Sequence, residues 1–152
     1  MATMKRPRLR TVEALSGYRL KLAFADGTAQ EVSLADDIAR LSGLAPLKDA
    51  GEFAKASVIE GEGWTVEWPD LDIQIGADTL WLEAQAQNAP DENTRVFAQW
   101  RARHGLSLSE AAEALGMTPR TMSAYGSGKR PVPRYIALAC KGWEAGLAAD
   151  KS

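Results

Sequence analysis

Apolar and polar residues alternate along the first part of the chain. The alternation over residues 18–24 has the two-residue period of a half-buried strand, with its apolar side chains on one face. The dipeptide Asp26-Gly27 that follows is typical of a tight hairpin turn, and Val32 and Leu34 continue the pattern beyond it. These positions predict two antiparallel strands joined by a short turn.

A second alternating stretch follows after a break. A short helical turn is expected over residues 35–41, and two further strands over residues 64–68 and 71–75. Asp78 is expected to cap a helix whose apolar residues are Leu80, Trp81 and Ala84. The fold class is therefore predicted to be α+β, with a small antiparallel α+β domain over residues 1–86.

The apolar spacing becomes helical after a short polar linker, residues 86–92. Pro90 is expected near the start of the next helix, with Asp91 and Glu92 in its first turn. Its inner stripe is predicted to be Val96, Phe97 and Trp100, and Gly105 is expected to end it. The same helical spacing continues to the end of the chain, so we predict an all-α domain over residues 90–148.

Residues 107–131 predict two short helices joined by a tight turn. Ser107 can cap the first helix, with Glu110 completing a capping box, and Gly116 can end that helix in a left-handed conformation. Thr118 can cap the second helix, with Pro119 at its first position. The inner face is predicted to consist of Leu115, Met117, Met122 and Tyr125. This pattern is typical of a helix-turn-helix unit, whose second helix can enter the major groove of DNA.

These helices resemble the Cro/C1-type (lambda-repressor-like) DNA-binding domain, from about Asn93 to Leu147. The matching positions are Ala112, Gly116, Met117, Met122, Tyr125 and the tail Ser127–Arg134. Three positions depart from the family pattern. Leu108 stands where the family usually carries Gln, and Ala124 and Gly126 stand where it usually carries longer polar side chains.

The resemblance implies a set of DNA-binding residues. It assigns base contacts to Arg120 and Thr121 near the start of the recognition helix, and phosphate contacts to Lys129, Arg130 and Arg134 after it. The full predicted set is Ser107, Thr118, Arg120, Thr121, Ser123, Ser127, Lys129, Arg130 and Arg134. For the basic residues the alternative is solvated surface charge, and for Ser107 and Thr118 it is helix capping alone.

The first 85 or so residues resemble a small bacterial domain family of unknown function. The segments that carry this resemblance are Phe24–Gly27, Leu44–Asp49 with Phe53 after it, and Trp64–Pro69. Members of that family occur alone or fused to a Cro/C1-type domain. Because the family has no established activity, the resemblance implies an organisation but no chemistry.

Composition narrows the function further. The chain has 152 residues, of which 45% are hydrophobic, and this supports packed cores. A single Cys140, expected to be a buried thiol, excludes an internal disulfide framework, and the lone His104 argues against a histidine-rich metal site. No apolar run reaches the ~20 residues of a membrane helix, and no signal peptide is recognised, so a cytoplasmic protein is expected.

Charge is distributed unevenly between the two halves. Residues 1–90 carry nine Lys/Arg and fourteen Asp/Glu, whereas residues 91–152 carry nine and six. A modestly basic domain joined to an acidic one suits a DNA-binding module fused to a different kind of domain. The N-terminal cations Lys5, Arg6, Arg8 and Arg10 are expected to form a solvated tail rather than an arm on DNA.

Other candidate sites have simpler explanations. Trp64 and Trp68 are expected to be core or half-buried strand residues. Asp70, Asp72 and Asp78 lack a histidine partner and a glycine-rich ligand loop, so a solvated acidic edge is expected rather than a metal site or a catalytic carboxylate pair.

Three classes of function follow. The first is a DNA-binding transcriptional regulator whose N-terminal domain senses a ligand, dimerises or docks a protein partner. The alternative is a protein-interaction adaptor, for example antitoxin-like, with weak or no DNA reading. An enzyme comes last, because no nucleophile–base pair is recognised, and no cofactor or metal is expected.

The expected partners are double-stranded DNA and a second copy of the chain. A homodimer could address half-sites ~34 Å apart. Its interface is expected on the N-terminal sheet, with the C-terminal helix that carries Trp143 and Leu147 as the other candidate.

Overall fold

The computed structural model describes residues 6–59 and 61–150, and side-chain burial as far as residue 147. The chain divides into two compact units, Met1–Ala84 and Gln85–Ser152, each with its own buried core. The boundary between the units falls within helix α3 (Ala77–Asn88). No helix among the described residues is long and apolar enough to cross a membrane.

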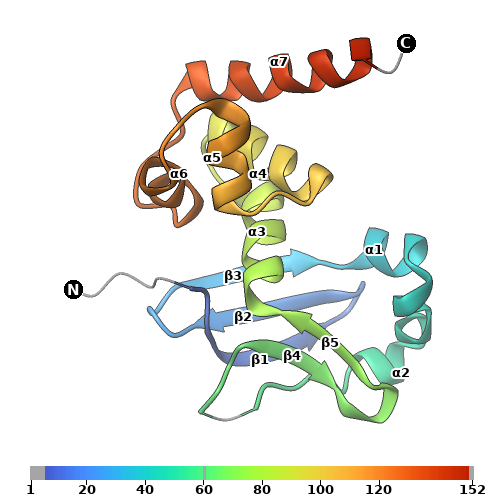
Figure 1. Cartoon of the computed structure of the whole chain (residues 1–152). Helices are drawn as coiled ribbons and strands as arrows, with labels where there is room; N and C mark the ends of the chain where they lie inside the picture. Colours follow the sequence, from blue (N-terminus) through green and yellow to red (C-terminus); the bar gives the residue numbers. More distant parts are fainter. Residues whose placement is uncertain (1–5, 60, 151–152) are drawn as a thin grey trace. The chain divides into compact units, whose positions relative to one another are not determined.

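The N-terminal unit contains two antiparallel sheets. Three strands form the first, in the order β1-β2-β3, and two form the second (Figure 1). Their bounds are β1 (Leu9–Leu15), β2 (Arg19–Phe24), β3 (Ala29–Ser33), β4 (Thr65–Trp68) and β5 (Ile73–Gly76). Leu20, Leu22 and Phe24 are fully buried, as their alternation predicts, and Gly27 adopts a φ of 92° in the hairpin turn.

Short helical segments connect and cover these strands. They are α1 (Ala35–Arg40), the 3₁₀ helix η1 (Ser42–Lys48), α2 (Ala50–Phe53) and the 3₁₀ turn η2 (Pro69–Leu71). Leu80, Trp81 and Ala84 on α3 complete the core, where Trp81 meets Phe24 edge to face at 5.0 Å between ring centroids. The predicted α+β class is confirmed.

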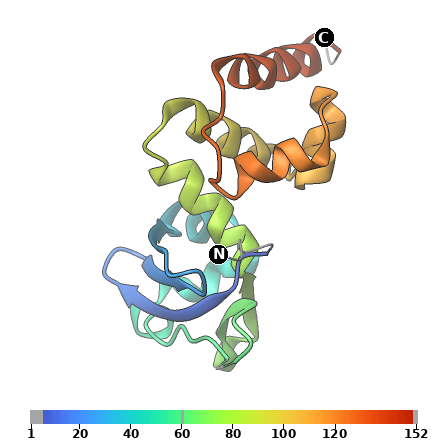
Figure 2. The same cartoon turned by 90° about the vertical axis from the view of Figure 1, so that its left-hand side faces the viewer.

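The C-terminal unit is built from four helices after the end of α3. They are α4 (Glu92–His104), α5 (Leu108–Leu115), α6 (Pro119–Gly126) and α7 (Arg134–Asp150). The largest buried side chains of its core include Phe97, Trp100, Met122 and Ile136. Figure 2 shows α7, in red, lying along one side of the other helices of this unit.

Several local predictions need correction. Strand β1 is not among the predicted strands, and Arg10 lies inside it, so Arg8 and Arg10 do not belong to a solvated tail; Lys5 lies outside the described residues. Leu9, at the start of β1, is buried. Its N–H donates a 2.7 Å hydrogen bond to the carbonyl of Gly63, which lies just before β4, and this bond holds the start of β1 in the unit.

Other corrections concern the ends of elements. Helix α3 begins at Ala77, so Asp78 lies in its first turn, and the helix continues to Asn88 through much of the predicted linker. Asp91 is the N-cap of α4, and Pro90 precedes that cap. Leu34 is buried but lies just beyond β3, before α1.

Candidate nucleic-acid interface

Helix α5 begins with a complete capping box. Ser107 Oγ accepts a hydrogen bond from Glu110 N, and Glu110 Oε1 accepts one from Ser107 N, both at 3.1 Å. These bonds favour the ionised carboxylate and hold the pKa of Glu110 below its usual value. Ser107 is exposed, but its hydroxyl is already used to start the helix.

The turn between α5 and α6 is fixed by its backbone and by a second cap. Gly116 adopts a φ of 67° at the end of α5, and Met117 N donates to the Ala112 carbonyl at 2.9 Å. Thr118 Oγ1 accepts from Thr121 N at 3.2 Å and shares a 2.9 Å hydrogen bond with the Thr121 hydroxyl. The hydroxyl of Thr121 therefore already has a hydrogen-bond partner in the Thr118 cap.

Helix α6 has a buried face and an exposed face. Met122 and Tyr125 point into the core, where Tyr125 meets Phe97 edge to face at 6.1 Å between centroids. Burial and a hydrogen bond with Tyr135 raise the pKa of Tyr125. On the opposite face Arg120 and Ser123 are exposed. The arrangement presents one long basic side chain at the start of the helix.

Leu108 and Gly126, two of the three positions that depart from the Cro/C1 pattern, lie close together. A Cβ added to Gly126 would lie 2.6 Å from Leu108 Cδ2 and 3.1 Å from Leu108 Cδ1. Leu108, at the start of α5, therefore occupies the space that a larger residue at position 126 would need. Leu108 packs against the core of this unit, and Ala124 on α6 is half-buried.

The loop between α6 and α7 carries the basic residues. Gly128 adopts a φ of 79°, and Gly128 N and Arg130 N donate to the carbonyls of Tyr125 and Ala124 at 3.2 and 3.1 Å. Lys129 and Arg130 are exposed, as are Ser127 before them and Arg134 at the start of α7. In the part of the chain that the structure describes, none of Arg120, Lys129, Arg130 and Arg134 forms an ion pair.

Thr94 anchors this loop, and sequence reasoning missed it. Its Oγ1 accepts a hydrogen bond from Val132 N at 3.2 Å and donates to the Asp91 cap at 2.9 Å. Thr94 is buried, and Val132 is 2% exposed. One hydroxyl thus links the start of α4 to the end of the basic loop. The spacing of Asp91 and Thr94 could have indicated the cap, but nothing local indicates the bond to Val132.

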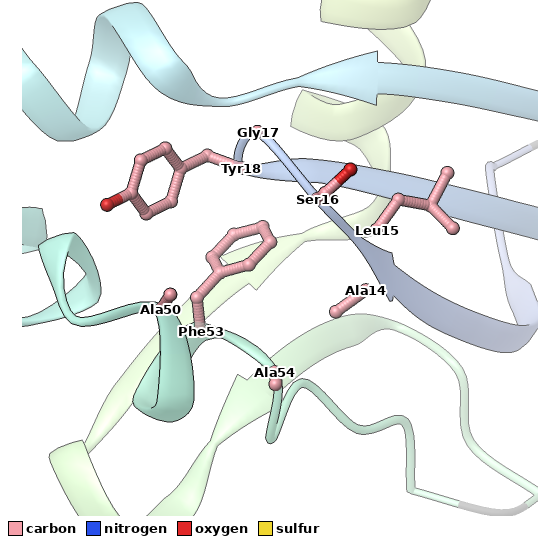
Figure 3. A pocket seen from close by; sticks show the side chains of 8 residues that line it. All are labelled: Ala14, Leu15, Ser16, Gly17, Tyr18, Ala50, Phe53 and Ala54. Carbon is pink, nitrogen blue, oxygen red and sulfur yellow. The ribbon is translucent and has the colours of Figure 1, made fainter.

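The N-terminal unit contains a separate pocket of about 390 Å³ between the β1–β2 turn and α2 (Figure 3). Its walls are mostly apolar, with Ser16 as a polar lining residue. Tyr18 and Phe53 meet edge to face at 5.5 Å between centroids, and Ala14 and Ala54 line another side. Tyr18 adopts a φ of 59°, which is unusual for a residue with a side chain. Its hydroxyl donates to the Lys48 carbonyl.

Cys140, Trp64 and Trp68 differ in their burial. Cys140 is buried, and burial raises the pKa of its thiol to about 12. Trp68 is buried and donates through Nε1 to the Phe53 carbonyl at 3.0 Å. The prediction for Trp64 is wrong, because its side chain is 47% exposed. Among the residues with described placement, no group of three metal-ligating side chains occurs.

Comparison with known proteins supports this two-part organisation. The family described as "Protein of unknown function (DUF2442)" matches residues 9–86, and the family described as "Helix-turn-helix domain" matches residues 94–146. The chain is also similar to the crystal structure of "Putative DNA Binding Protein NE0471" from Nitrosomonas europaea ATCC 19718. The two share 39% sequence identity with a TM-score of 0.61, over 95% of this chain and 91% of that one. No curated protein matches.

Proposed function

Since the chain belongs to the family of proteins of unknown function DUF2442 and carries a helix-turn-helix domain, we propose that it is a transcriptional regulator that binds duplex DNA. We assign the helix-turn-helix to the Cro/C1 type and the place of action to the cytoplasm. The 39% identical relative, named "Putative DNA Binding Protein NE0471", supports the proposal.

The observation that carries the proposal is the group of four exposed cations around α6. Arg120 lies at the start of the helix, and Lys129, Arg130 and Arg134 follow it, none with a carboxylate partner among the described residues. Arg103 of the same unit, by contrast, forms an ion pair with Glu144. Unpaired cations beside an exposed helix face fit a phosphate backbone instead.

The four cations have two roles in this proposal. Arg120 enters the major groove and donates to a base edge, which is the pairing that arginine makes best with guanine. Lys129, Arg130 and Arg134 bind phosphates, and the Thr94–Val132 bond keeps their loop in place. Ser107, Thr118, Thr121, Ser123 and Ser127 border this face, where the two caps orient their helices.

We propose a homodimer as the working form, because one short recognition helix supplies few base contacts. Trp143 of α7 meets Trp100 edge to face at 5.5 Å between centroids and is half-buried in its own unit. The other face of α7, where Tyr135 and Leu138 are 62% and 53% exposed, is the candidate dimer interface of this unit. Light scattering on the full chain would report the oligomeric state, and a monomer that binds a palindrome as one copy would contradict the dimer.

A salt-titrated binding measurement on the full chain tests DNA binding. The affinity for a duplex of random sequence should fall linearly in a plot of log affinity against log salt. Lys129→Gln combined with Arg130→Gln should lower the slope by about 1.8, at about 0.9 for each lost phosphate contact. The matched control is Lys21→Gln with Lys48→Gln, two exposed cations of the N-terminal unit, which should leave the slope unchanged.

Sequence reading needs its own variant. Arg120→Ala should cost about 1–3 kcal/mol on a selected site and relax specificity at one base pair. Equal losses on every sequence would contradict base reading by Arg120.

A second candidate function is that of a protein-interaction adaptor. It is favoured by the contact between Leu108 and Gly126, which replaces polar side chains at the helix-turn-helix by packing. Absence of DNA binding even at low salt would reject the regulator and support this adaptor.

A further inference from the structure

An exposed tryptophan of the N-terminal unit lies within cation–π distance of two arginines. The guanidinium carbons of Arg6 and Arg8 lie 5.2 and 5.4 Å from the centroid of the Trp64 ring. Trp64 is 47% exposed, which is uncommon for so large an apolar side chain. Arg10, two residues further along β1, is also exposed and donates through Nη2 to the Ala25 carbonyl at 3.3 Å. We call Arg6, Arg8, Arg10 and Trp64 the arginine–tryptophan patch.

The backbone around the patch is fixed by several bonds. Arg8 donates through Nε to the Glu62 carbonyl at 2.6 Å and through Nη2 to the Gly61 carbonyl. A Cβ on Gly63 would lie 2.0 Å from the Leu9 carbonyl oxygen, so only glycine allows this close approach. On the other side Ala77 N donates to the Trp64 carbonyl at 2.7 Å. These bonds hold the backbone at Trp64 in place, and the guanidinium groups of Arg6 and Arg8 lie over its ring.

The charge of the patch contrasts with that of its surroundings. The first 90 residues contain fourteen acidic and nine basic residues, yet Arg6, Arg8 and Arg10 occur at every second position without an acidic residue between them. Among the described residues none of the three forms an ion pair. A guanidinium that is stacked on a ring keeps its N–H groups available at the edge, where they can donate to an anion.

We propose that the arginine–tryptophan patch is a second contact for the phosphate backbone of duplex DNA. Arg6 and Arg10 bind phosphates, while Arg8 holds the loop and Trp64 positions the guanidinium groups. This inference rests on the proposed function, because the helix-turn-helix domain brings DNA to the same chain. Duplex DNA is favoured over an acidic protein because tethering raises the effective concentration of that one polyanion at the patch. Guanidinium groups also match phosphate oxygens with two parallel hydrogen bonds.

The test uses the full chain and a duplex of random sequence, about 40 base pairs long, at about 100 mM salt. Arg6→Gln combined with Arg10→Gln should weaken binding by at least about fivefold and lower the salt slope by about 1–2. Trp64→Leu should weaken binding by a smaller factor, because the arginines remain but lose their support. Lys21→Gln with Lys48→Gln removes the same charge elsewhere on the unit and should change neither quantity.

The outcomes separate this inference from the proposed function. If Lys129→Gln with Arg130→Gln weakens binding and Arg6→Gln with Arg10→Gln behaves like the control, the patch proposal is wrong and the regulator proposal stands. If the wild-type chain binds no duplex, both are wrong. If the patch variant binds DNA normally but loses binding to a polyglutamate probe, the patch is a site for an acidic protein and our proposal is overturned.

Discussion

The two units differ in the sequence range of the contacts that stabilise them. In the C-terminal unit, helix ends are closed by side chains three residues apart, as in Ser107 with Glu110 and Thr118 with Thr121. In the N-terminal unit, key hydrogen bonds join residues far apart in the sequence. One of these joins Leu9 to Gly63.

The C-terminal unit therefore relies more on short-range contacts at the starts of its helices, and the N-terminal unit more on long-range hydrogen bonds. The helices around the turn are started by their own caps, so the placement of Arg120 along α6 depends on a few short contacts. The N-terminal unit also depends on bonds between segments that are far apart in the sequence, such as the bond from Leu9 N to the Gly63 carbonyl, which holds the start of β1. The C-terminal unit also has long-range contacts, because the Thr94–Val132 bond spans 38 residues and Arg103 pairs with Glu144.

The largest effects are expected from emptying each core separately. Leu22 and Met122 are both fully buried, so Leu22→Ala and Met122→Ala should each cost about 2–5 kcal/mol of unfolding free energy. Because the two cores share no residue, hydrogen exchange should rise over residues 9–76 in the first variant and over residues 94–146 in the second. Equal rises in both units would break the comparison.

A smaller loss of stability is expected from breaking the hydrogen bond between Thr94 and Val132. Thr94→Val keeps the shape of the side chain but leaves Val132 N without its acceptor, which should cost about 1–3 kcal/mol. The basic loop should also loosen, so DNA affinity should fall even where the variant is fully folded. Thr11→Val, at an exposed position of β1, is the matched control and should change neither thermal stability nor binding. A stable variant with normal DNA affinity would contradict the anchoring role.

The N-terminal unit should be the pH-sensitive one. Burial, together with a hydrogen bond to Asp37, raises the pKa of Glu83 from 4.5 to about 8, with Arg40 opposing the shift. The folded unit therefore keeps a proton that the unfolded chain releases, and stability falls as the pH rises from about 4.5 to about 8.

Melting curves at several pH values would measure this effect. We expect the N-terminal unit to melt several degrees lower at the alkaline end, at about 4–8 °C for each kcal/mol in a unit of this size. Glu83→Gln should remove the dependence, whereas Glu13→Gln, at an exposed position of β1, should keep it. A pH dependence that survives in Glu83→Gln would assign it to another group.

The smallest effect should come from the contact between Leu108 and Gly126. Gly126→Ala should destabilise the C-terminal unit, because its Cβ meets Leu108. In a Leu108→Ala background the same change should stabilise the helix, since alanine is favoured over glycine within helices by about 1 kcal/mol. Unfolding free energies of the four proteins form a double-mutant cycle, and additive changes would show that the two positions do not interact.

The C-terminal unit follows from its sequence in detail for a physical reason. Ser107, Glu110, Gly116, Thr118 and Pro119 all occupy their predicted places, because caps and left-handed glycines act within one helical turn. The positions of the interface residues along the helices and the loop therefore follow from local sequence alone. Their contacts with DNA stay predictions.

The N-terminal unit follows less completely from its sequence. Strand β1 carries Arg10, Thr11 and Glu13, and no clear alternation distinguishes it from a polar tail. It becomes a strand because β2 pairs with it in antiparallel register, from Leu15 opposite Arg19 to Leu9 opposite Phe24. Trp64 has the same difficulty, because the alternation places it with Val66 but its ring stays outside the core.

The sequence by itself determined the order of the two units, the ends of the helices around the turn and the side of each helix that is buried. Those properties follow from contacts within a few residues and from the period of the apolar side chains. Only the tertiary structure decided which polar groups pair across the chain. It joined Thr94 to the basic loop, Glu83 to Asp37 and the N-terminal arginines to Trp64, because such pairs depend on distances that no local pattern encodes.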